Sequence, residues 1–206
     1  MGYLNKKLIS LLGTLALFSF SCSSKNLNLS QYPIEKPLIT GIDGFLSSDL
    51  NKVCSKLEKE CNTPVVIEPV GFWHENIPEI RQAYKQGRNI ILIGFSMGSE
   101  QMKLTAKQCE KENILINLLI VIDPTYTNLS DLDIPNNVKR IRPYFSTNGF
   151  DFMKWARGNP EKFRKNKNTE IDNAVFLRGT HLGCVRWDNL GTDLIEEVNR
   201  YTKKSP

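Results

Sequence analysis

Short apolar runs alternate with amphipathic segments along most of this chain. Runs rich in isoleucine, leucine and valine are typical of buried strands, and we predict strands at residues 37–40, 65–67, 90–93 and 115–122, with weaker candidates at 138–145 and 174–177. Apolar residues recurring every three or four positions predict the intervening helices, at residues 47–60, 77–86, 100–112 and 188–201. Apolar strands separated by helices are typical of a parallel sheet covered on both faces. We therefore predict a three-layer α/β fold with a mostly parallel sheet of about six strands.

The first residues do not follow this alternation. Lys6 and Lys7 precede an apolar run at residues 8–20, which is shorter than the roughly 20 residues that span a membrane. A basic start followed by a short apolar run predicts an export signal over residues 1–21. The next residue, Cys22, resembles the lipobox cysteine of bacterial lipoproteins, which implies an acylated N-terminus that anchors an exported protein to a membrane. The alternative is an ordinary signal peptide with an incidental cysteine.

The rest of the sequence predicts one folded domain. Residues 23–36 are polar and rich in serine and asparagine, so we expect residues 22–36 to form a flexible tether between the lipid and the domain. Residues 37–206 contain no internal repeat and no shift in composition that would mark a second domain. That length is sufficient for a single domain with its own core.

The charge of the chain gives no support to a nucleic-acid partner. The sequence has 27 Lys and Arg against 22 Asp and Glu, a formal net charge of +5. Part of this excess lies between Lys154 and Lys167, where we expect a solvated face, with a surface beside an anionic membrane as the alternative. We expect a monomer that acts on a small molecule and binds no nucleic acid.

Four cysteines follow Cys22, and an even number in an exported chain predicts one or two disulfides. Cys54 and Cys61 are an unsuitable pair, because two turns of one predicted helix separate them by about 10 Å. The other two are Cys109 and Cys184. No cysteine pair has the spacing of zinc ligands, and with two histidines in the chain we expect no metal site.

The most informative motif lies at residues 89–99. An apolar strand runs directly into Gly94-Phe95-Ser96-Met97-Gly98, and a helix-forming segment follows. A sharp turn between a strand and a helix lifts a serine hydroxyl out of the sheet, and the first N–H groups of the helix point at developing negative charge. This pattern predicts Ser96 as a nucleophile.

A serine nucleophile needs a base, and the chain offers His74 and His181. His181 lies between the last predicted strand and the last predicted helix, on a loop at the carboxyl edge of the sheet where Ser96 also emerges. We therefore predict His181 as the base. His74 also follows a strand, and we expect it to be a surface or pocket-wall residue.

The residues alone leave more than one candidate for the acid that orients the base. Asp123 ends the most apolar strand and precedes Pro124, so its carboxylate could hold the imidazole through Nδ1–H. Asp123 could instead only cap the loop that follows. Asp151, after the next strand, is the main competitor, while Asp131 and Asp133 in the long loop are less favoured.

The order of Ser96, Asp123 and His181, together with the strand-to-helix turn, resembles the α/β-hydrolase superfamily, in particular its small serine esterases and lipases. The resemblance covers residues 37–206. It implies an α/β-hydrolase-like fold and a triad, Ser96, Asp123 and His181, that cleaves a carboxylic ester or thioester through an acyl-enzyme, with no cofactor. The family usually places its acid after the strand that follows the one ending at Asp123, so Asp151 stays open.

The same resemblance implies an oxyanion hole. Asp43-Gly44-Phe45 stands where such enzymes often carry His-Gly-Phe, so the N–H groups of Phe45 and Met97 would bind the oxyanion. Asp43 in place of the histidine is a departure from the family pattern. Aromatic residues on loops near this edge could line a substrate pocket, and the candidates are Phe45, Phe72, Trp73, Phe95 and Tyr126.

Other functions fit the same residues. A lipase or phospholipase, and a thioesterase or acyltransferase, would use the same triad on a different substrate. A hydrolase-fold lipoprotein that binds a ligand without catalysis is an alternative from another class, motivated by Asp43 and by the ambiguous acid. We predict a membrane-anchored serine hydrolase that acts on a small ester or lipid.

Overall fold

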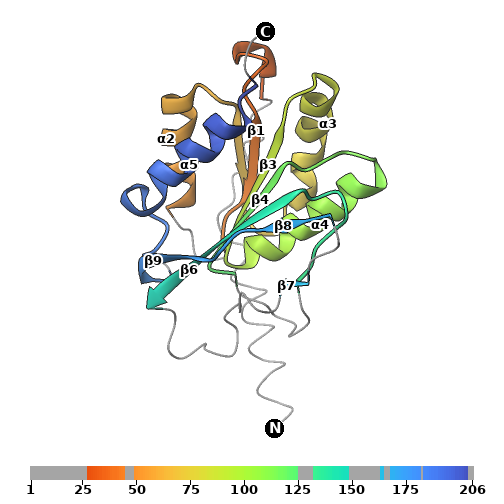
Figure 1. Cartoon of the computed structure of the whole chain (residues 1–206). Coiled ribbons are helices and arrows are strands. Elements are labelled where there is room, and N and C mark those ends of the chain that lie inside the picture. Colours follow the sequence, from red (N-terminus) through yellow and green to blue (C-terminus); the bar gives the residue numbers. More distant parts are fainter. Residues whose placement is uncertain are drawn as a thin grey trace.

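A computed structural model gives the fold of the chain and describes residues 27–44, 49–124, 132–148, 163–164, 168–181 and 183–203. A twisted central sheet separates two layers of helices (Figure 1). The predicted three-layer α/β architecture is therefore confirmed.

The central sheet is parallel in every pairing among the described residues. Its strand order is β2-β1-β3-β4-β6, and both β8 and β9 pair with β6. The strands are β1 (Leu38–Ile42), β2 (Val65–Glu68), β3 (Ile90–Phe95), β4 (Leu118–Ile122), β6 (Arg140–Asn148), β8 (Glu170–Ile171) and β9 (Val175–Thr180). A separate small sheet pairs β5 (Leu132–Asp133) with β7 (Phe163–Arg164).

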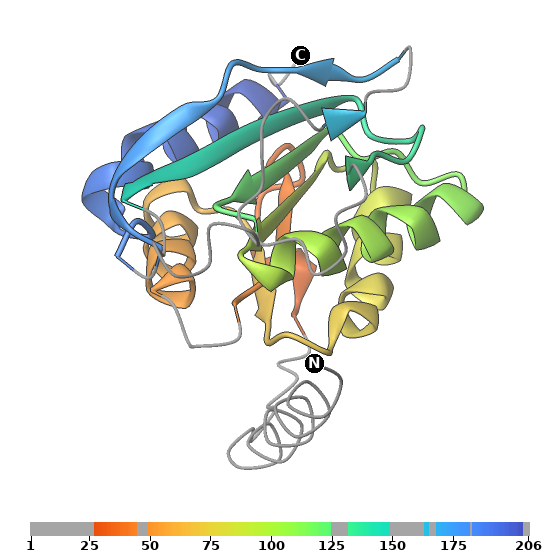
Figure 2. The same ribbon diagram turned by 90° about the horizontal axis from the view of Figure 1, so that it is seen from below.

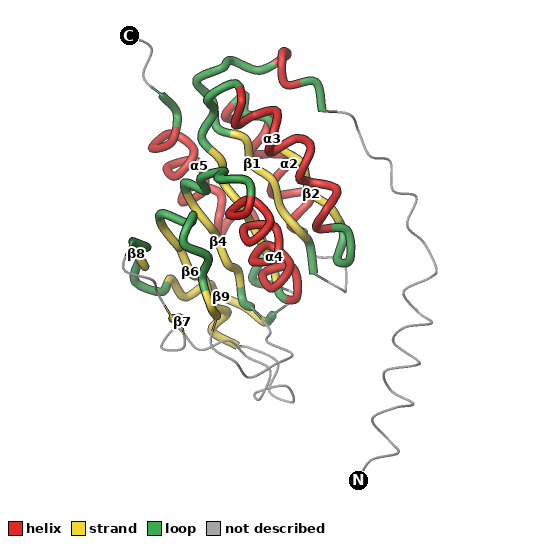
Figure 3. Tube along the Cα trace, turned by 90° about the vertical axis from the view of Figure 1, so that its right-hand side faces the viewer, coloured by secondary structure: helices red, strands yellow, loops and turns green. Residues whose placement is uncertain are grey.

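The helices cover both faces of this sheet (Figure 2). On one face lie α2 (Leu50–Cys61) and α5 (Trp187–Tyr201). On the other lie α3 (Ile77–Lys85) and α4 (Met97–Lys111), which stand in front of the strands in Figure 3. Two short 3-10 helices, η1 (Leu29–Gln31) and η2 (Trp73–Asn76), complete the described elements.

Strand β3 explains why the strands read as continuously apolar. Ile90 and Leu92 join the core beneath α3 and α4, while Ile91 and Ile93 join the core beneath α2 and α5. A strand covered on both faces buries every side chain, so the period-two alternation of a half-exposed strand is absent.

Several element boundaries differ from the sequence prediction. Helix α4 begins at Met97, directly after Ser96, and β9 extends to Thr180. Strand β4 begins at Leu118 rather than at residue 115. The two-residue strands β5, β7 and β8 were not expected, because a strand of that length has no periodicity to recognise.

The folded domain begins before the predicted boundary at residue 37. Leu29 is fully buried and belongs to the core on the α3 and α4 face. Arg88, itself buried, donates hydrogen bonds to the carbonyl oxygens of Leu29, Tyr32, Pro33 and Lys36. Residues 27–36, which we expected to form part of a tether, are thus packed on the domain.

The expected disulfides are not present among the described cysteines. Cys54, Cys61, Cys109 and Cys184 are all buried free thiols. Cys109 lies in the core beneath α3 and α4, whereas the other three lie in the core on the opposite face, so the sheet separates it from them. Burial raises the pKa of Cys109 and of Cys184 to about 12, which keeps both as unreactive thiols.

An ion-pair network joins β6 to α5. Arg140 lies 2.7 Å from the carboxylate of Glu197 and 2.6 Å from that of Asp172. Arg142 lies 3.0 Å from the Asp193 carboxylate. Because charges with little exposure are costly when one partner is lost, the network holds α5 in one position against β6.

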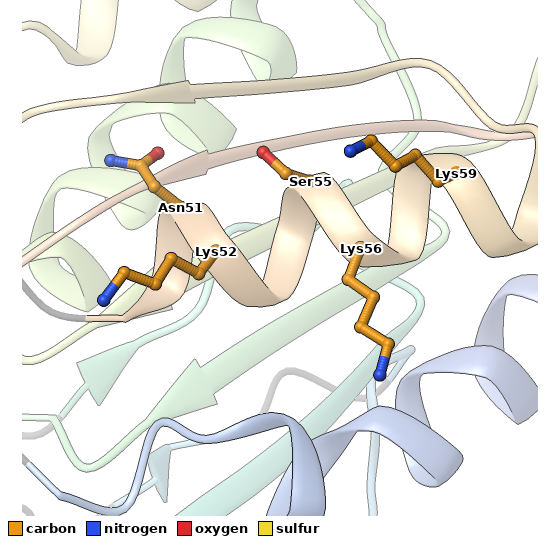
Figure 4. Close-up of a pocket in the computed structure, with 5 residues that line it drawn as sticks. All are labelled: Asn51, Lys52, Ser55, Lys56 and Lys59. Carbon is orange, nitrogen blue, oxygen red and sulfur yellow. The ribbon is translucent and has the colours of Figure 1, made fainter.

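The outer face of α2 carries three exposed lysines. A shallow surface hollow of about 480 Å³ is lined there by Asn51, Lys52, Ser55, Lys56 and Lys59 (Figure 4). Lys52 lies 2.7 Å from Asp49, and Lys56 lies 3.6 Å from Glu60. These carboxylates offset much of the positive charge.

The basic run between Lys154 and Lys167 lies largely outside the described residues. In the described part of the chain, none of the helices combines the length and the apolar character needed to span a bilayer.

We predict that Leu29→Ala destabilises the domain by about 3 kcal/mol, because it removes a fully buried side chain and leaves a cavity. Ile34→Ala, in the same segment but 60% exposed, should change the free energy of unfolding by less than about 0.5 kcal/mol. Urea unfolding of both variants measures the difference. Equal, small effects would show that residues 27–36 do not contribute to the fold.

Candidate active site

The turn between β3 and α4 holds Ser96 in an unusual backbone conformation. Its φ of 54° and ψ of −125° lie outside the regions that a non-glycine residue favours. The Ser96 N–H donates to the Ile122 carbonyl of β4 at 2.9 Å, and the Ser99 N–H donates to the Ser96 carbonyl at 3.1 Å. The strained turn is therefore held by hydrogen bonds on both sides and carries Ser96 out of the sheet.

Steric contacts explain why glycines flank this serine. A Cβ at Gly98 would lie 2.2 Å from the Ile42 carbonyl oxygen, and a Cβ at Gly94 would lie 2.5 Å from the Cα of Ser99. Neither distance is compatible with a side chain. Both positions therefore have to be glycine for α4 to pack this closely on β1 and β3.

The structure brings the three predicted triad residues together at the carboxyl edge of the sheet. Asp123 follows β4 directly, and His181 follows β9 directly. His181 Nε2 lies 2.8 Å from Ser96 Oγ, and His181 Nδ1 lies 2.6 Å from Asp123 Oδ2. The exposed fractions are 7% for Ser96, 2% for Asp123 and 6% for His181. These distances allow a continuous hydrogen-bonded chain from the carboxylate to the hydroxyl.

A residue that the sequence did not single out also contacts the carboxylate. Ser146 on β6 donates to Asp123 twice, from Oγ to Oδ2 at 2.7 Å and from its N–H to Oδ1 at 3.1 Å. Burial alone would raise the pKa of the Asp123 carboxyl, but the hydrogen bonds from His181 and Ser146 outweigh it and hold the pKa below its usual value. Asp123 is therefore a carboxylate at neutral pH.

Phe95 packs against the imidazole of His181. The two ring centroids lie 4.9 Å apart, with an interplanar angle of 28°. A Cβ at Gly44 would lie 2.8 Å from the Phe95 ring and 3.2 Å from the Ser96 Cβ, so the backbone after β1 also lies against this site. The phenyl ring limits rotation of the imidazole away from Ser96.

One of the two expected oxyanion donors is described. Met97 is the first residue of α4, where backbone N–H groups have no partner within the helix. Phe45, expected as the second donor, lies outside the described residues. Nearby, the buried Asp43 side chain accepts a hydrogen bond from the Gly44 N–H at 2.7 Å. Asp43 thus stabilises the backbone turn directly after β1.

The remaining predicted residues lie in different surroundings. Phe72 and Trp73 are half-buried, and Trp73 packs against the core on the α3 and α4 face. The Trp73 carbonyl accepts a hydrogen bond from Thr105 Oγ1 at 3.3 Å. His74 is on the surface, with Nε2 3.2 Å from the Glu75 carboxylate. Tyr126, Asp131, Asp151 and Cys22 lie outside the described residues, and Asp133 lies in β5.

Sequence reasoning missed Ser146 because its role depends on strand register. Ile122 of β4 pairs with Tyr144 of β6, and the Asp123 N–H donates to the Tyr144 carbonyl at 2.7 Å. That register carries Ser146 past the end of β4 and next to Asp123. The only sequence feature that pointed to Ser146 was its place at the end of a predicted strand. That feature alone does not identify a partner of the acid. Across the described ranges, no group of three or more His, Cys, Asp and Glu residues could hold a metal ion.

Comparison with known proteins establishes the fold. No protein-family model and no curated protein matches this sequence. The thioesterase domain SrfTE, described in the cyclization of the lipopeptide antibiotic surfactin, is similar with a TM-score of 0.53 at 14% identity, over 90% of this chain and 100% of that one. A candidate α/β-hydrolase from Agrobacterium tumefaciens gives a TM-score of 0.56 at 14% identity, over 84% of this chain and 90% of that one. An arylesterase gives a TM-score of 0.53 at 12% identity, over 82% of this chain and 77% of that one. The chain has the α/β-hydrolase fold.

We predict that Gly98→Ala destabilises the protein by about 3 kcal/mol or more, because the added methyl group would overlap the backbone of β1. Leu104→Ala, at a 41% exposed position of the same helix, should cost less than about 1 kcal/mol. Thermal unfolding of both variants is the measurement. A Gly98→Ala protein as stable as Leu104→Ala would contradict the close packing of α4 on β1.

Proposed function

We propose that this protein is a serine hydrolase that cleaves a carboxylic ester or thioester through an acyl-enzyme. The observation that carries the proposal is the hydrogen-bonded arrangement of Ser96, His181 and Asp123, with Ser96 presented by a strained turn before a helix. The α/β-hydrolase fold is consistent with this activity. A fold hosts many activities, so the side-chain geometry is the stronger support.

In the first half-reaction, Ser96 Oγ attacks the substrate carbonyl carbon while His181 Nε2 accepts the hydroxyl proton. The N–H of Met97, at the start of α4, donates to the resulting oxyanion, with the N–H of Phe45 as the second proposed donor. Collapse of the tetrahedral intermediate breaks the bond to the leaving oxygen or sulfur, which takes the proton from His181. The products are the acyl-Ser96 ester and a free alcohol or thiol.

Water completes the cycle. His181 Nε2 accepts a proton from a water molecule as the water oxygen attacks the acyl-Ser96 carbonyl. His181 then donates that proton to Ser96 Oγ as the second tetrahedral intermediate collapses. The carboxylic acid leaves. During both attacks His181 becomes an imidazolium, and the Asp123 carboxylate stabilises it through Nδ1–H. The contact of 2.6 Å supports Asp123 as the acid in preference to Asp151.

The substrate class is proposed at the level of esters and thioesters. Structures similar to this chain include a thioesterase domain and an arylesterase, so both leaving groups belong in the proposal. Phe72, Trp73 and Tyr126 are the proposed pocket-lining residues. A lipase or phospholipase would use the same chemistry on a larger acyl substrate.

We also propose that the protein is exported and anchored to a membrane through acylated Cys22, with residues 1–21 removed as a signal peptide. The support is the basic start, the short apolar run and the cysteine that follows them. An anchored hydrolase acting on a small ester or lipid, as a monomer, needs no nucleic acid, metal or cofactor partner.

The test of the catalytic proposal is labelling by a fluorophosphonate probe, which reacts with activated serine hydroxyls. We expect the wild-type protein to be labelled and Ser96→Ala to be unlabelled. His181→Gln should lose about 10⁴-fold in labelling rate, because Ser96 then has no base. His74→Gln is the matched control, since it alters the other histidine, which is exposed, and should label at the wild-type rate.

Turnover of a panel of esters and thioesters of increasing acyl length then defines the substrate class. Asp123→Asn should reduce kcat by about 10⁴-fold, whereas Asp151→Asn should leave it unchanged. The reverse result would assign the acid to Asp151. Absence of wild-type labelling, or equal labelling of Ser96→Ala, would favour the catalytically silent binding protein.

The anchoring proposal predicts that Cys22→Ser abolishes acylation and releases the protein from the membrane fraction, because the thiol that accepts the lipid is lost. Metabolic labelling with a fatty-acid analogue, followed by membrane fractionation, is the measurement. Ser24→Ala, two residues away, is the control and should remain acylated. Acylated Cys22→Ser protein in the membrane fraction would overturn the proposal.

A further inference from the structure

We propose that Ser146 is a positioning residue that fixes the Asp123 carboxylate against His181. This inference rests on the proposed function, because it assigns a role within the same site. Ser146 donates two hydrogen bonds to Asp123 and acts on the base through that carboxylate.

The two hydrogen bonds from Ser146 define the plane of the carboxylate. The backbone N–H binds Oδ1 and the side-chain hydroxyl binds Oδ2, so both oxygens are held by one residue of β6. A carboxylate held only at one oxygen can rotate about its terminal torsion, which is broad in free aspartate. Held at both, Asp123 keeps Oδ2 directed at Nδ1 of His181, at 2.6 Å.

The backbone of Asp123 makes this support necessary. Its φ of 39° lies in the left-handed region, which is unfavourable for a residue with a side chain. Apart from its main-chain bond to Tyr144, the side chain is what ties Asp123 to β6. A strained residue at the end of a strand persists only where surrounding contacts fix it, and Ser146 supplies two of these contacts.

Strand β6 also sets the position of the base. It lies between β4, which leads to Asp123, and β9, which leads to His181. The register between β6 and β9 shifts just after Ser146, between Ser146 and Asn148, as in a β-bulge. Ser146 is fully buried at this point. The residue that holds the acid therefore lies directly between the two strands that carry the acid and the base.

The role of the hydroxyl is electrostatic as well as geometric. A hydrogen bond from a hydroxyl to an ionised carboxylate stabilises the charged form and so lowers the pKa of Asp123. An ionised Asp123 accepts from Nδ1–H and leaves Nε2 free to accept the Ser96 proton. Loss of the Ser146 hydroxyl should weaken the preference of His181 for a proton on Nδ1, while the hydrogen bond from the Ser146 backbone N–H remains.

The kinetic test compares Ser146→Thr with Ser146→Val, which differ only in a hydroxyl against a methyl group. We expect Ser146→Thr to keep most of the wild-type kcat and Ser146→Val to show a kcat about tenfold lower than Ser146→Thr, with KM changed by less than about twofold. Ser146→Ala should resemble Ser146→Val. Ser55→Ala, an exposed serine on α2, is the control and should match the wild type.

A spectroscopic test separates positioning from general structural loss. A proton shared between Nδ1 of a histidine and a carboxylate gives a far-downfield NMR resonance, and a His74→Gln background leaves His181 as its only histidine source. We expect this resonance in the wild type and in Ser146→Thr, and expect it to move upfield or broaden in Ser146→Val. Thermal unfolding should show that both variants are folded.

The outcomes are distinguishable. An unchanged resonance and an unchanged kcat in Ser146→Val would overturn the positioning role, and so would equal losses in Ser146→Thr and Ser146→Val. A shifted resonance with unchanged kcat would overturn its importance for the reaction. If the wild type hydrolyses no ester or thioester, the proposed function fails, whereas the resonance still decides whether Ser146 positions Asp123.

Discussion

The close approach of the turn after β3 to its two neighbouring strands is the constraint on which the site depends. Gly98 lies against the carbonyl of Ile42 at the end of β1, and the Ser96 N–H is bonded to the carbonyl of Ile122 at the end of β4. The nucleophile candidate is therefore fixed relative to both flanking strands at once. One of these strands leads to Asp43 and Gly44, and the other leads to Asp123. The strain at Ser96 is tolerated because these backbone contacts leave the turn no alternative path.

Strand β6 is the second element that positions the site. It carries Ser146 toward Asp123, pairs with β9 ahead of His181, and is tied to α5 by Arg140 and Arg142. His181 lies on the short connection between β9 and α5, so the position of the imidazole depends on both elements. Ion pairs with little exposure are weak evidence for net stability, because desolvation offsets much of the Coulomb attraction. Their consequence here is specificity, since an α5 displaced from β6 would separate Arg140 from Glu197 and Arg142 from Asp193.

Much of the fold followed from the sequence because buried parallel strands have a clear signature. The strand ending at Asp123 and the strand before Ser96 were found from apolar runs, and their common carboxyl edge led to His181. What could not be predicted depends on register or on long-range packing. Ser146 becomes a partner of Asp123 only through the pairing of β4 with β6. The polar residues near Leu29 pack on the domain through long-range contacts, which include the burial of Leu29 and the hydrogen bonds from Arg88 to their carbonyl groups. The disulfide expectation was wrong because the number of cysteines does not show where each thiol lies in the fold: the sheet separates Cys109 from the other three, and those three are free thiols within one core.

The position of the acid shows how side chains from different strands can form one arrangement. Asp123 follows β4, the immediate neighbour of β3, so it lies close to Ser96. His181 follows β9, on the other side of β6, and the Asp123 carboxylate therefore has to be held from the β6 side to bind the imidazole. Ser146 on the intervening strand is in a position to supply that support, with its hydroxyl and its backbone N–H on different oxygens of the carboxylate. Phe95, the last residue of β3, stacks on the ring of His181 and restricts rotation of the imidazole. Acid and base are thus each held by a neighbour outside the three residues, and this second set of contacts is what converts nearby side chains into a defined geometry.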